Sequence, residues 1–156
     1  MRRSEQRRAA VWALYQSDLL GRPLEELFAP DSHAFTRALA GLVRERQPAL
    51  DELIATHASG WSLERIAPLE RSILRVALGE MLYPDEIPGE APIPPEGAIN
   101  EAVETAKQFC GADTPGFVNG ILGAVLEDLR VGSLGPPAQP ADVALGETEG
   151  KRPPRA

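Results

Sequence analysis

Apolar side chains recur at every third or fourth position along most of this chain. In one stretch, Leu69, Ile73, Val76 and Ala77 form such a stripe. This spacing places side chains on one face of an α-helix, which completes a turn about every 3.6 residues. No stretch alternates apolar and polar residues over five or more positions with β-branched enrichment, as a half-buried strand would. The pattern therefore predicts an all-α fold.

Capping residues and prolines predict where these helices begin and end. Ser32 is a typical N-cap, and Thr114 directly before Pro115 is the combination expected of an N-cap and a first helical residue. Pro48 disfavours helical geometry in the residue before it, so we expect a break after Gln47. The result is a compact bundle of about seven helices over residues 5–20, 33–47, 50–57, 62–66, 68–83, 96–109 and 115–129, with a further short turn around residues 24–28.

Two segments rich in proline and glycine do not fit the helical pattern. The segment from Pro84 to Gly97 contains five prolines and several acids, which predicts a long acidic surface loop. Residues 133–156 have no periodic apolar face, which favours a disordered C-terminal tail. We therefore expect a helical domain over residues 1–132 and a tail over residues 133–156.

The charge of the chain is unevenly distributed. The formal net charge is -7, which on its own argues against a nucleic-acid partner, because phosphates are neutralised by lysine and arginine. However, residues 1–15 contain four arginines and one glutamate, whereas residues 85–104 contain six acids and no basic residue. The chain thus has one basic end and one acidic segment.

The sequence offers no enzymatic constellation. Cys110 is the only cysteine, so an intramolecular disulfide is excluded, and His33 and His57 are not spaced as a zinc pair. We see neither a nucleophile with its base nor a phosphate-binding loop, and expect no enzyme activity, cofactor or metal site. The N-terminus lacks the uninterrupted apolar stretch of a signal peptide, and no segment is long and apolar enough to cross a bilayer, so we expect a cytoplasmic protein.

The N-terminal arginines admit two interpretations. On a helix, Arg3, Arg7 and Arg8 would project as a patch able to contact successive phosphates, or they would simply be a solvated terminus. Nearby, Trp12 and Tyr15 would offer stacking surfaces for unpaired bases or would belong to the core. The residues alone leave both alternatives open.

Three stretches of the chain resemble the NusB family. They are RRAAVWALYQSDL from Arg7, LERSILRVALGEML from Leu69, and AINEAVETAKQF with CGADTPGFVNGILGAVLEDL from Ala98. The similarity spans residues 7–130, and its long INEAVE and FVNG motifs are quite specific. The resemblance implies two small helical subdomains packed across each other.

The resemblance also implies a function and partners. Members of the family join NusE, a ribosomal protein of the small subunit, and the heterodimer binds the boxA element of nascent ribosomal RNA. This loads an antitermination complex on RNA polymerase, and the family includes both monomers and homodimers. A strongly basic ribosomal protein would suit the acidic surface of this chain.

Site residues follow from the resemblance position by position. Asp113 matches an acidic position that modulates RNA affinity, and we expect its carboxylate to repel phosphate. Tyr15 and Glu70 match positions at the NusE interface, with two arginines on the same helix as Glu70 nearby. The implied RNA-binding residues are Arg3, Arg7, Arg8, Lys107, Phe109, Asp113 and Phe117, and the implied protein-partner residues are Tyr15, Glu70, Arg71 and Arg75.

Two rival functions stay open at this point. The same helical module is fused to some RNA cytosine methyltransferases, which would need a further α/β domain with a glycine-rich loop and a catalytic cysteine. A second rival is a helical protein-protein interaction module that does not bind RNA directly. The sequence also departs from the family at the loop from Pro84 to Gly97 and in the tail.

Overall fold

The computed structural model describes residues 1–89 and 92–132, and the regular secondary structure within these ranges is entirely helical. Five α-helices and three 3₁₀ turns lie in this part of the chain, without a strand. The all-α prediction is therefore confirmed, although the count of about seven helices is slightly too high. In chain order the elements are α1 (Arg3–Leu20), η1 (Leu24–Glu26), α2 (Ala34–His57), η2 (Leu63–Arg65), α3 (Pro68–Leu82), η3 (Pro84–Glu86), α4 (Pro95–Phe109) and α5 (Thr114–Arg130).

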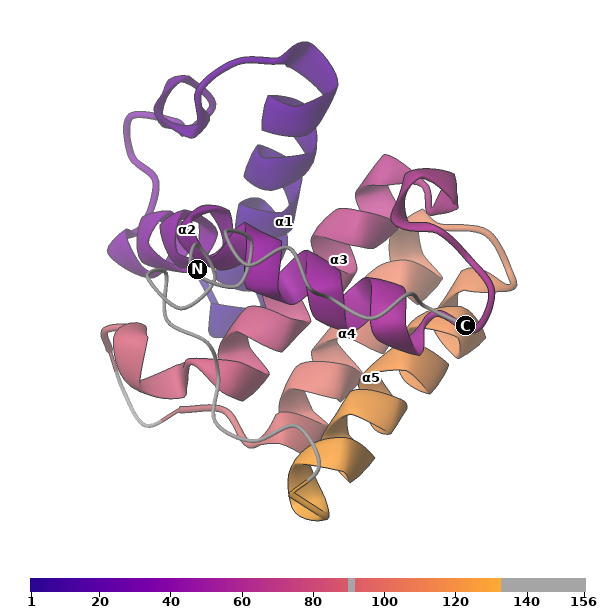
Figure 1. The fold of residues 1–156 in the computed structure, drawn as a ribbon. Helices are drawn as coiled ribbons and strands as arrows, with labels where there is room; N and C mark the ends of the chain where they lie inside the picture. Colours follow the sequence, from indigo (N-terminus) through magenta and orange to yellow (C-terminus); the bar gives the residue numbers. More distant parts are fainter. Residues whose placement is uncertain (90–91, 133–156) are drawn as a thin grey trace, which may run out of the picture.

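Helix α3 lies at the centre of the fold. Its residues from Ser72 to Met81 are all buried, as expected for a helix with apolar side chains around much of its circumference. It contacts each of the other four helices, while α1 also packs against α2 and α4 against α5. Figure 1 shows α3 among the other helices. The pair α1 and α2 and the pair α4 and α5 therefore both pack against α3.

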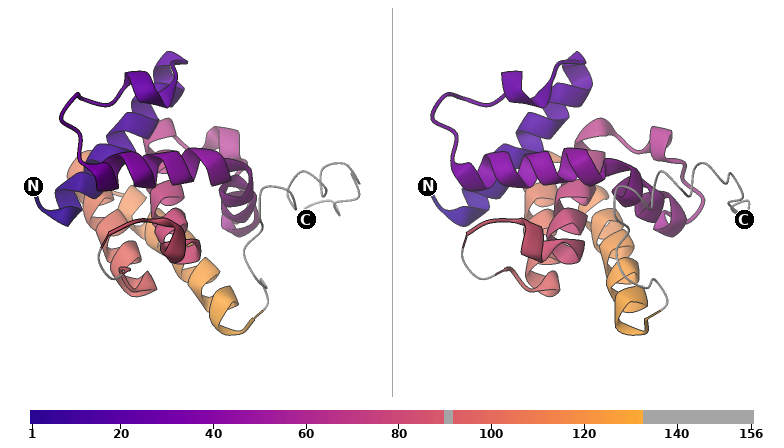
Figure 2. Two further views of the ribbon diagram at one scale, coloured as in Figure 1. Left: turned by 90° about the vertical axis from the view of Figure 1, so that its left-hand side faces the viewer. Right: turned by 60° about the vertical axis from the view of Figure 1, so that its left-hand side comes forward.

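The predicted break at Pro48 is wrong, because α2 continues through this proline to His57. The buried side chains Val43, Arg46, Leu50 and Ile54 follow one another at intervals of three or four residues across it. Burial of this stripe therefore outweighs the loss of one backbone hydrogen bond at the exposed proline. Figure 2 shows that α2 changes direction along its length, as expected of a helix with an internal proline.

Two predicted N-caps are also displaced by one residue. His33 rather than Ser32 occupies the N-cap of α2, and Asp113 rather than Thr114 occupies that of α5. Thr114 is the first residue of α5, and its hydroxyl donates to Glu70 at 2.8 Å instead of capping the helix. A long-range contact has therefore replaced the local one that the sequence suggested.

The proline-rich segment is structured at both ends. Its first residues, Pro84–Glu86, form η3, and Pro95 begins α4, so the irregular part is shorter than predicted. Gly89 has a φ of 126°, a conformation that side chains disfavour. The predicted disordered tail, residues 133–156, lies outside the described residues.

Candidate nucleic-acid and protein interface

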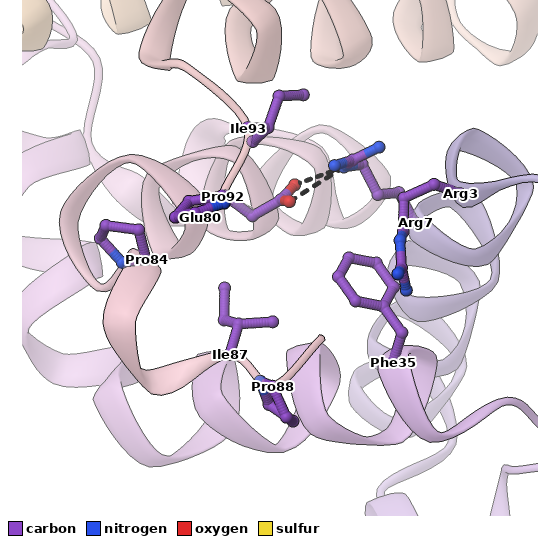
Figure 3. A pocket seen from close by; sticks show the side chains of 9 residues that line it. All are labelled: Arg3, Arg7, Phe35, Glu80, Pro84, Ile87, Pro88, Pro92 and Ile93. Atoms are coloured by element: carbon purple, nitrogen blue, oxygen red, sulfur yellow. Dashed lines mark hydrogen bonds and ion pairs between the residues drawn. The ribbon is translucent and has the colours of Figure 1, made fainter. Parts of the chain in front are cut away.

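Arg7 is held by an ion pair with a buried carboxylate. Its Nε donates to both carboxylate oxygens of Glu80 on α3, at 2.8 and 2.9 Å (Figure 3). The side chains are only 12% and 5% exposed, respectively. Burial raises the pKa of Glu80 above its usual value, although the hydrogen bond from Arg7 acts in the opposite direction. This pair anchors α1 on α3, and a phosphate contact by Arg7 stays a prediction.

Arg3 lies beside this pair and close to the proline-rich loop. Its guanidinium carbon lies 4.1 Å from the centre of the Phe35 ring, a cation-π contact. A Cβ added at Gly89 would lie 3.4 Å from Nη2 of Arg3, so the backbone of the loop passes close to the guanidinium. Arg3 and Phe35 line a cavity of about 120 Å³ together with Arg7, Glu80, Pro84, Ile87, Pro88, Pro92 and Ile93 (Figure 3).

Arg8 differs from its two neighbours because no carboxylate engages it within residues 1–89 and 92–132. The side chain is half-buried, and its Nε is buried without a hydrogen-bond acceptor. Of the three arginines that the resemblance implies, Arg8 is thus the one whose guanidinium has no ion pair or ring contact in the described part of the chain.

A cluster of three aromatic rings includes Trp12, which follows Arg8 by four positions on α1. The ring centre of Trp12 is 5.6 Å from that of Tyr15 and 5.1 Å from that of Phe109 at the end of α4. Both contacts are edge-to-face, with interplanar angles of 76° and 85°. Trp12 therefore contacts both Tyr15, which is implied at the protein interface, and Phe109, which is implied at the RNA interface.

A second cluster joins the start of α5 to the segment before α3. The rings of Trp61 and Phe117 meet with centres 5.9 Å apart, and the guanidinium of Arg65 lies 5.5 Å from the centre of the Trp61 ring. These residues line a cavity of about 240 Å³ together with Ile66, Glu70, Asp113 and Thr114. Asp113 is exposed, and its side chain and that of Glu70 both line this cavity.

Glu70 connects the two aromatic clusters. It accepts the hydrogen bond of Thr114 on one side, and on the other side its charge acts on Cys110, the residue after Phe109. Burial and, to a smaller extent, the Glu70 carboxylate raise the pKa of the Cys110 thiol. We use the name interface strip for the neighbouring side chains of Trp12, Tyr15, Phe109, Glu70, Thr114, Asp113, Phe117 and Trp61, of which Thr114 is buried.

Lys107 adds a positive charge near one end of the strip. It is exposed on α4, two residues before Phe109, and its Nζ lies 3.3 Å from the carboxylate of Glu104. Because both side chains are more than half exposed, this ion pair is weak and leaves the ammonium accessible.

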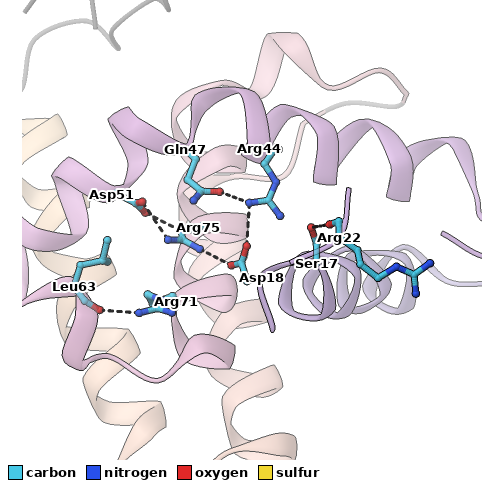
Figure 4. A network of polar contacts seen from close by, with 9 residues as sticks. All are labelled: Ser17, Asp18, Arg22, Arg44, Gln47, Asp51, Leu63, Arg71 and Arg75. Carbon is cyan, nitrogen blue, oxygen red and sulfur yellow. Dashed lines mark hydrogen bonds and ion pairs between the residues drawn. The ribbon is translucent and has the colours of Figure 1, made fainter. Parts of the chain in front are cut away.

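The other two arginines implied at the protein interface make contacts within the chain. Arg75 is 6% exposed and forms ion pairs with Asp18 of α1 at 2.9 Å and with Asp51 of α2 at 2.7 Å (Figure 4). Arg71 donates to the backbone oxygen of Leu63 at 3.2 Å. Arg75 therefore ties α1, α2 and α3 together, and a direct contact of either arginine with a partner stays a prediction.

Our sequence interpretation did not single out Trp61 and Arg65. A tryptophan directly after Gly60, in a segment between two helices, was the available signal, because Trp61 is 49% exposed and large exposed aromatic side chains often mark interaction sites. The contact of Trp61 with Phe117 could not be read from spacing, since the two residues lie on different elements.

Neither a metal site nor a membrane span emerges from the described ranges. No three His, Cys, Asp or Glu side chains there are grouped so that they could hold a metal ion. No helix in the same ranges is long and apolar enough to cross a membrane.

Comparison with known proteins places the chain in a family. Residues 4–127 match the model of the NusB family, which is most of the chain. The chain belongs to the NusB family. Among curated relatives, the transcription antitermination protein NusB of Salinispora tropica is 37% identical over 135 residues, covering 80% of this chain and 95% of that protein.

Solved NusB structures have the same fold. A structure of T. maritima NusB is 28% identical, with a TM-score of 0.71, and the match covers 82% of this chain and 92% of that chain. A complex described as antitermination factors NusB and NusE with double-stranded RNA contains a chain with a TM-score of 0.65. At 24% identity over 81% of this chain and 98% of that chain, this second likeness shows the shared fold alone.

Proposed function

We propose that this chain is a transcription antitermination factor that binds boxA-type RNA of nascent ribosomal transcripts together with NusE. By doing so it helps to assemble an antitermination complex on RNA polymerase. Membership of the NusB family and the name of the curated relative support the antitermination role. The observation that carries the joint binding is the interface strip, where residues implied for RNA and residues implied for NusE alternate.

The strip provides surfaces for both kinds of partner. Phe109 and Phe117 supply aromatic rings, and Arg8 and Lys107 supply the positive charge that phosphates need. Tyr15 and Glu70 lie between these groups, so a protein bound there would border the RNA directly. Arg3 and Arg7 hold α1 and the proline-rich loop in place, and we assign them a positioning role first.

The charge of the chain favours binding that depends on NusE. With a net charge of -7, and with Arg7 and Arg75 occupied by carboxylates, the chain offers few cations to RNA on its own. A basic ribosomal protein bound to the strip would add positive charge beside the RNA. We infer that the heterodimer, rather than this chain alone, is the RNA-binding species.

The second candidate is a helical module that binds proteins but not RNA. The occupied arginines favour it, because a protein partner requires fewer free cations than RNA does. Our proposal further places the chain in the cytoplasm, where bacterial transcription takes place. A homodimer that covers Arg8 until NusE binds is a third possible state, and light scattering after size exclusion would detect it.

Charge reversal at Arg8 separates the two candidates. We expect Arg8→Glu to lower the affinity of the NusE-bound chain for a boxA-type RNA by about tenfold or more, since phosphate contacts provide much of such affinity. Binding of NusE alone should change little. Arg130→Glu is the control, because Arg130 is exposed at the far end of α5, where its only change of contact within the described residues is the exposed ion pair with Glu96. A gel shift in which both variants bind RNA equally well would favour the protein module.

A further inference from the structure

Trp12 is placed at the surface rather than in the core. Its side chain is partly exposed, and it belongs neither to the buried apolar core nor to the partly buried apolar side chains packed against that core. The same holds for Tyr15 and Phe109, its two aromatic neighbours. Of the two interpretations that the sequence left open for Trp12, core or stacking surface, its position therefore favours the second.

The indole of Trp12 is partly exposed and is not stacked in parallel on either aromatic neighbour. Its contacts with Tyr15 and Phe109 are both edge-to-face, whereas a nucleobase would stack in parallel. The two neighbours belong to different helices, one to α1 and the other to the end of α4, and the indole contacts both. A ring restrained in this way loses little conformational freedom when a ligand binds.

Arg8 supplies the second group that a nucleotide requires. It stands four residues before Trp12 on α1, and side chains at this spacing are neighbours, with Cβ atoms about 5 to 6 Å apart. A base and the phosphate of its own nucleotide are separated by a similar distance. No carboxylate pairs with Arg8 within the described ranges, so its charge is available to a phosphate.

We propose that Trp12 stacks on an unpaired base of the RNA while Arg8 contacts the adjoining phosphate. This rests on the proposed function and extends it, because the family resemblance carries Phe109 and Phe117 but not Trp12. Trp12 also touches Tyr15, so a partner bound at Tyr15 restrains the indole and lowers the entropic cost of stacking. Trp12 thus connects the protein-binding and RNA-binding parts of the interface strip.

Two substitutions of Trp12 distinguish stacking on an aromatic ring from a contact with any large apolar side chain. The test uses the full chain with the NusE-like protein and a single-stranded boxA-type RNA. Stacking of one base on an aromatic ring corresponds to about a 5- to 150-fold change in affinity, so we expect Trp12→Leu to weaken RNA binding within this range. Trp12→Phe, which keeps a π face, should retain most of the affinity. Phe28→Leu removes an aromatic ring outside the strip and should have no effect.

An abasic scan of the same RNA identifies the stacked base. In the wild-type complex, removal of one particular base should lower the RNA affinity about as much as Trp12→Leu does. In the Trp12→Leu complex, removal of that base should lower the RNA affinity no further, because the base and the Trp12 ring form a single contact. Affinity for the NusE-like protein in the absence of RNA is measured in parallel and should be the same for both Trp12 variants.

Several outcomes would overturn the inference. Equal RNA affinity of Trp12→Leu and the wild type would do so, as would equal losses of affinity in the Leu and Phe variants. The same holds if removal of each base lowers the RNA affinity of Trp12→Leu as much as that of the wild type. An RNA defect fully explained by weaker NusE binding would also reject direct stacking. A wild-type complex that fails to bind the RNA would reject the proposed function itself, and the inference with it.

Discussion

The ion pair between Arg7 and Glu80 predicts that two adjacent arginines respond very differently to the same substitution. Arg7→Met keeps the length of the side chain but leaves the buried carboxylate of Glu80, 5% exposed, without its cation. Breaking a buried pair by removing one partner costs about 3 to 5 kcal/mol. For a domain of this size, the melting temperature should fall by roughly 6 to 20 °C. Arg8→Met breaks no ion pair in the described residues and should cost at most about 1 kcal/mol.

The cost at Arg7 should depend on pH, and its sign follows from the pKa of Glu80. Burial raises this pKa, whereas the hydrogen bond and the charge of Arg7 lower it, so Arg7→Met raises it further. A carboxyl whose pKa is higher in the folded than in the unfolded state loses stability as the pH rises from the unfolded towards the folded pKa. Arg7→Met should therefore be less destabilising at about pH 5 than at about pH 8.

Urea unfolding followed by circular dichroism measures both effects, with Arg8→Met as the matched control. Replacing the pair on both sides, with Arg7→Met and Glu80→Leu together, should recover much of the stability, because no unpaired charge is then buried. The reasoning would be refuted if Arg7→Met cost no more than Arg8→Met, or if its cost were the same at both pH values.

Three further predictions concern the site and the fold. Asp113→Asn removes a negative charge from the lining of the cavity beside Phe117. It should tighten RNA binding about fivefold, which corresponds to about 1 kcal/mol of repulsion between a carboxylate and a phosphate in water. In a filter assay with Asp31→Asn as control, unchanged or weaker binding would contradict this prediction. Arg75→Met leaves Asp51 without its cation and Asp18 with Arg44 alone, and should lower the free energy of unfolding by about 3 to 5 kcal/mol. A variant with wild-type urea stability would reject the role given to this network. Pro48→Ala restores a backbone donor inside α2 and should raise stability by up to about 3 kcal/mol, whereas a lower melting temperature would mean that the proline geometry is required.

The sequence was sufficient for those parts of the fold that local pattern controls. The stripe within Leu69 to Leu82 predicted α3, and that helix is buried as its pattern indicates. The break expected at Pro48 failed because packing on both sides of the proline outweighs a local preference. Thr114 likewise gives its hydroxyl to Glu70, a residue 44 positions away, which a capping rule does not anticipate.

The site was predictable in composition but not in organisation. Resemblance to the family supplied the residues, yet it could not reveal that Arg7 is occupied, because its partner Glu80 lies 73 positions further along the chain. Nor could spacing indicate that Trp12 contacts Phe109, since α1 and α4 come together only in the folded protein. The distinction between Arg7, which holds the fold together, and Arg8, which is free to bind, depends on tertiary contacts.

The central claim is that this chain binds RNA jointly with its protein partner. The most direct test is a gel shift with a single-stranded boxA-type RNA, with and without the NusE-like protein, over a series of salt concentrations. Our account predicts weak binding by the chain alone, much tighter binding by the heterodimer, and affinity that falls steeply with salt because phosphates are contacted by cations. Equal affinity with and without the partner, at every salt concentration, would contradict it.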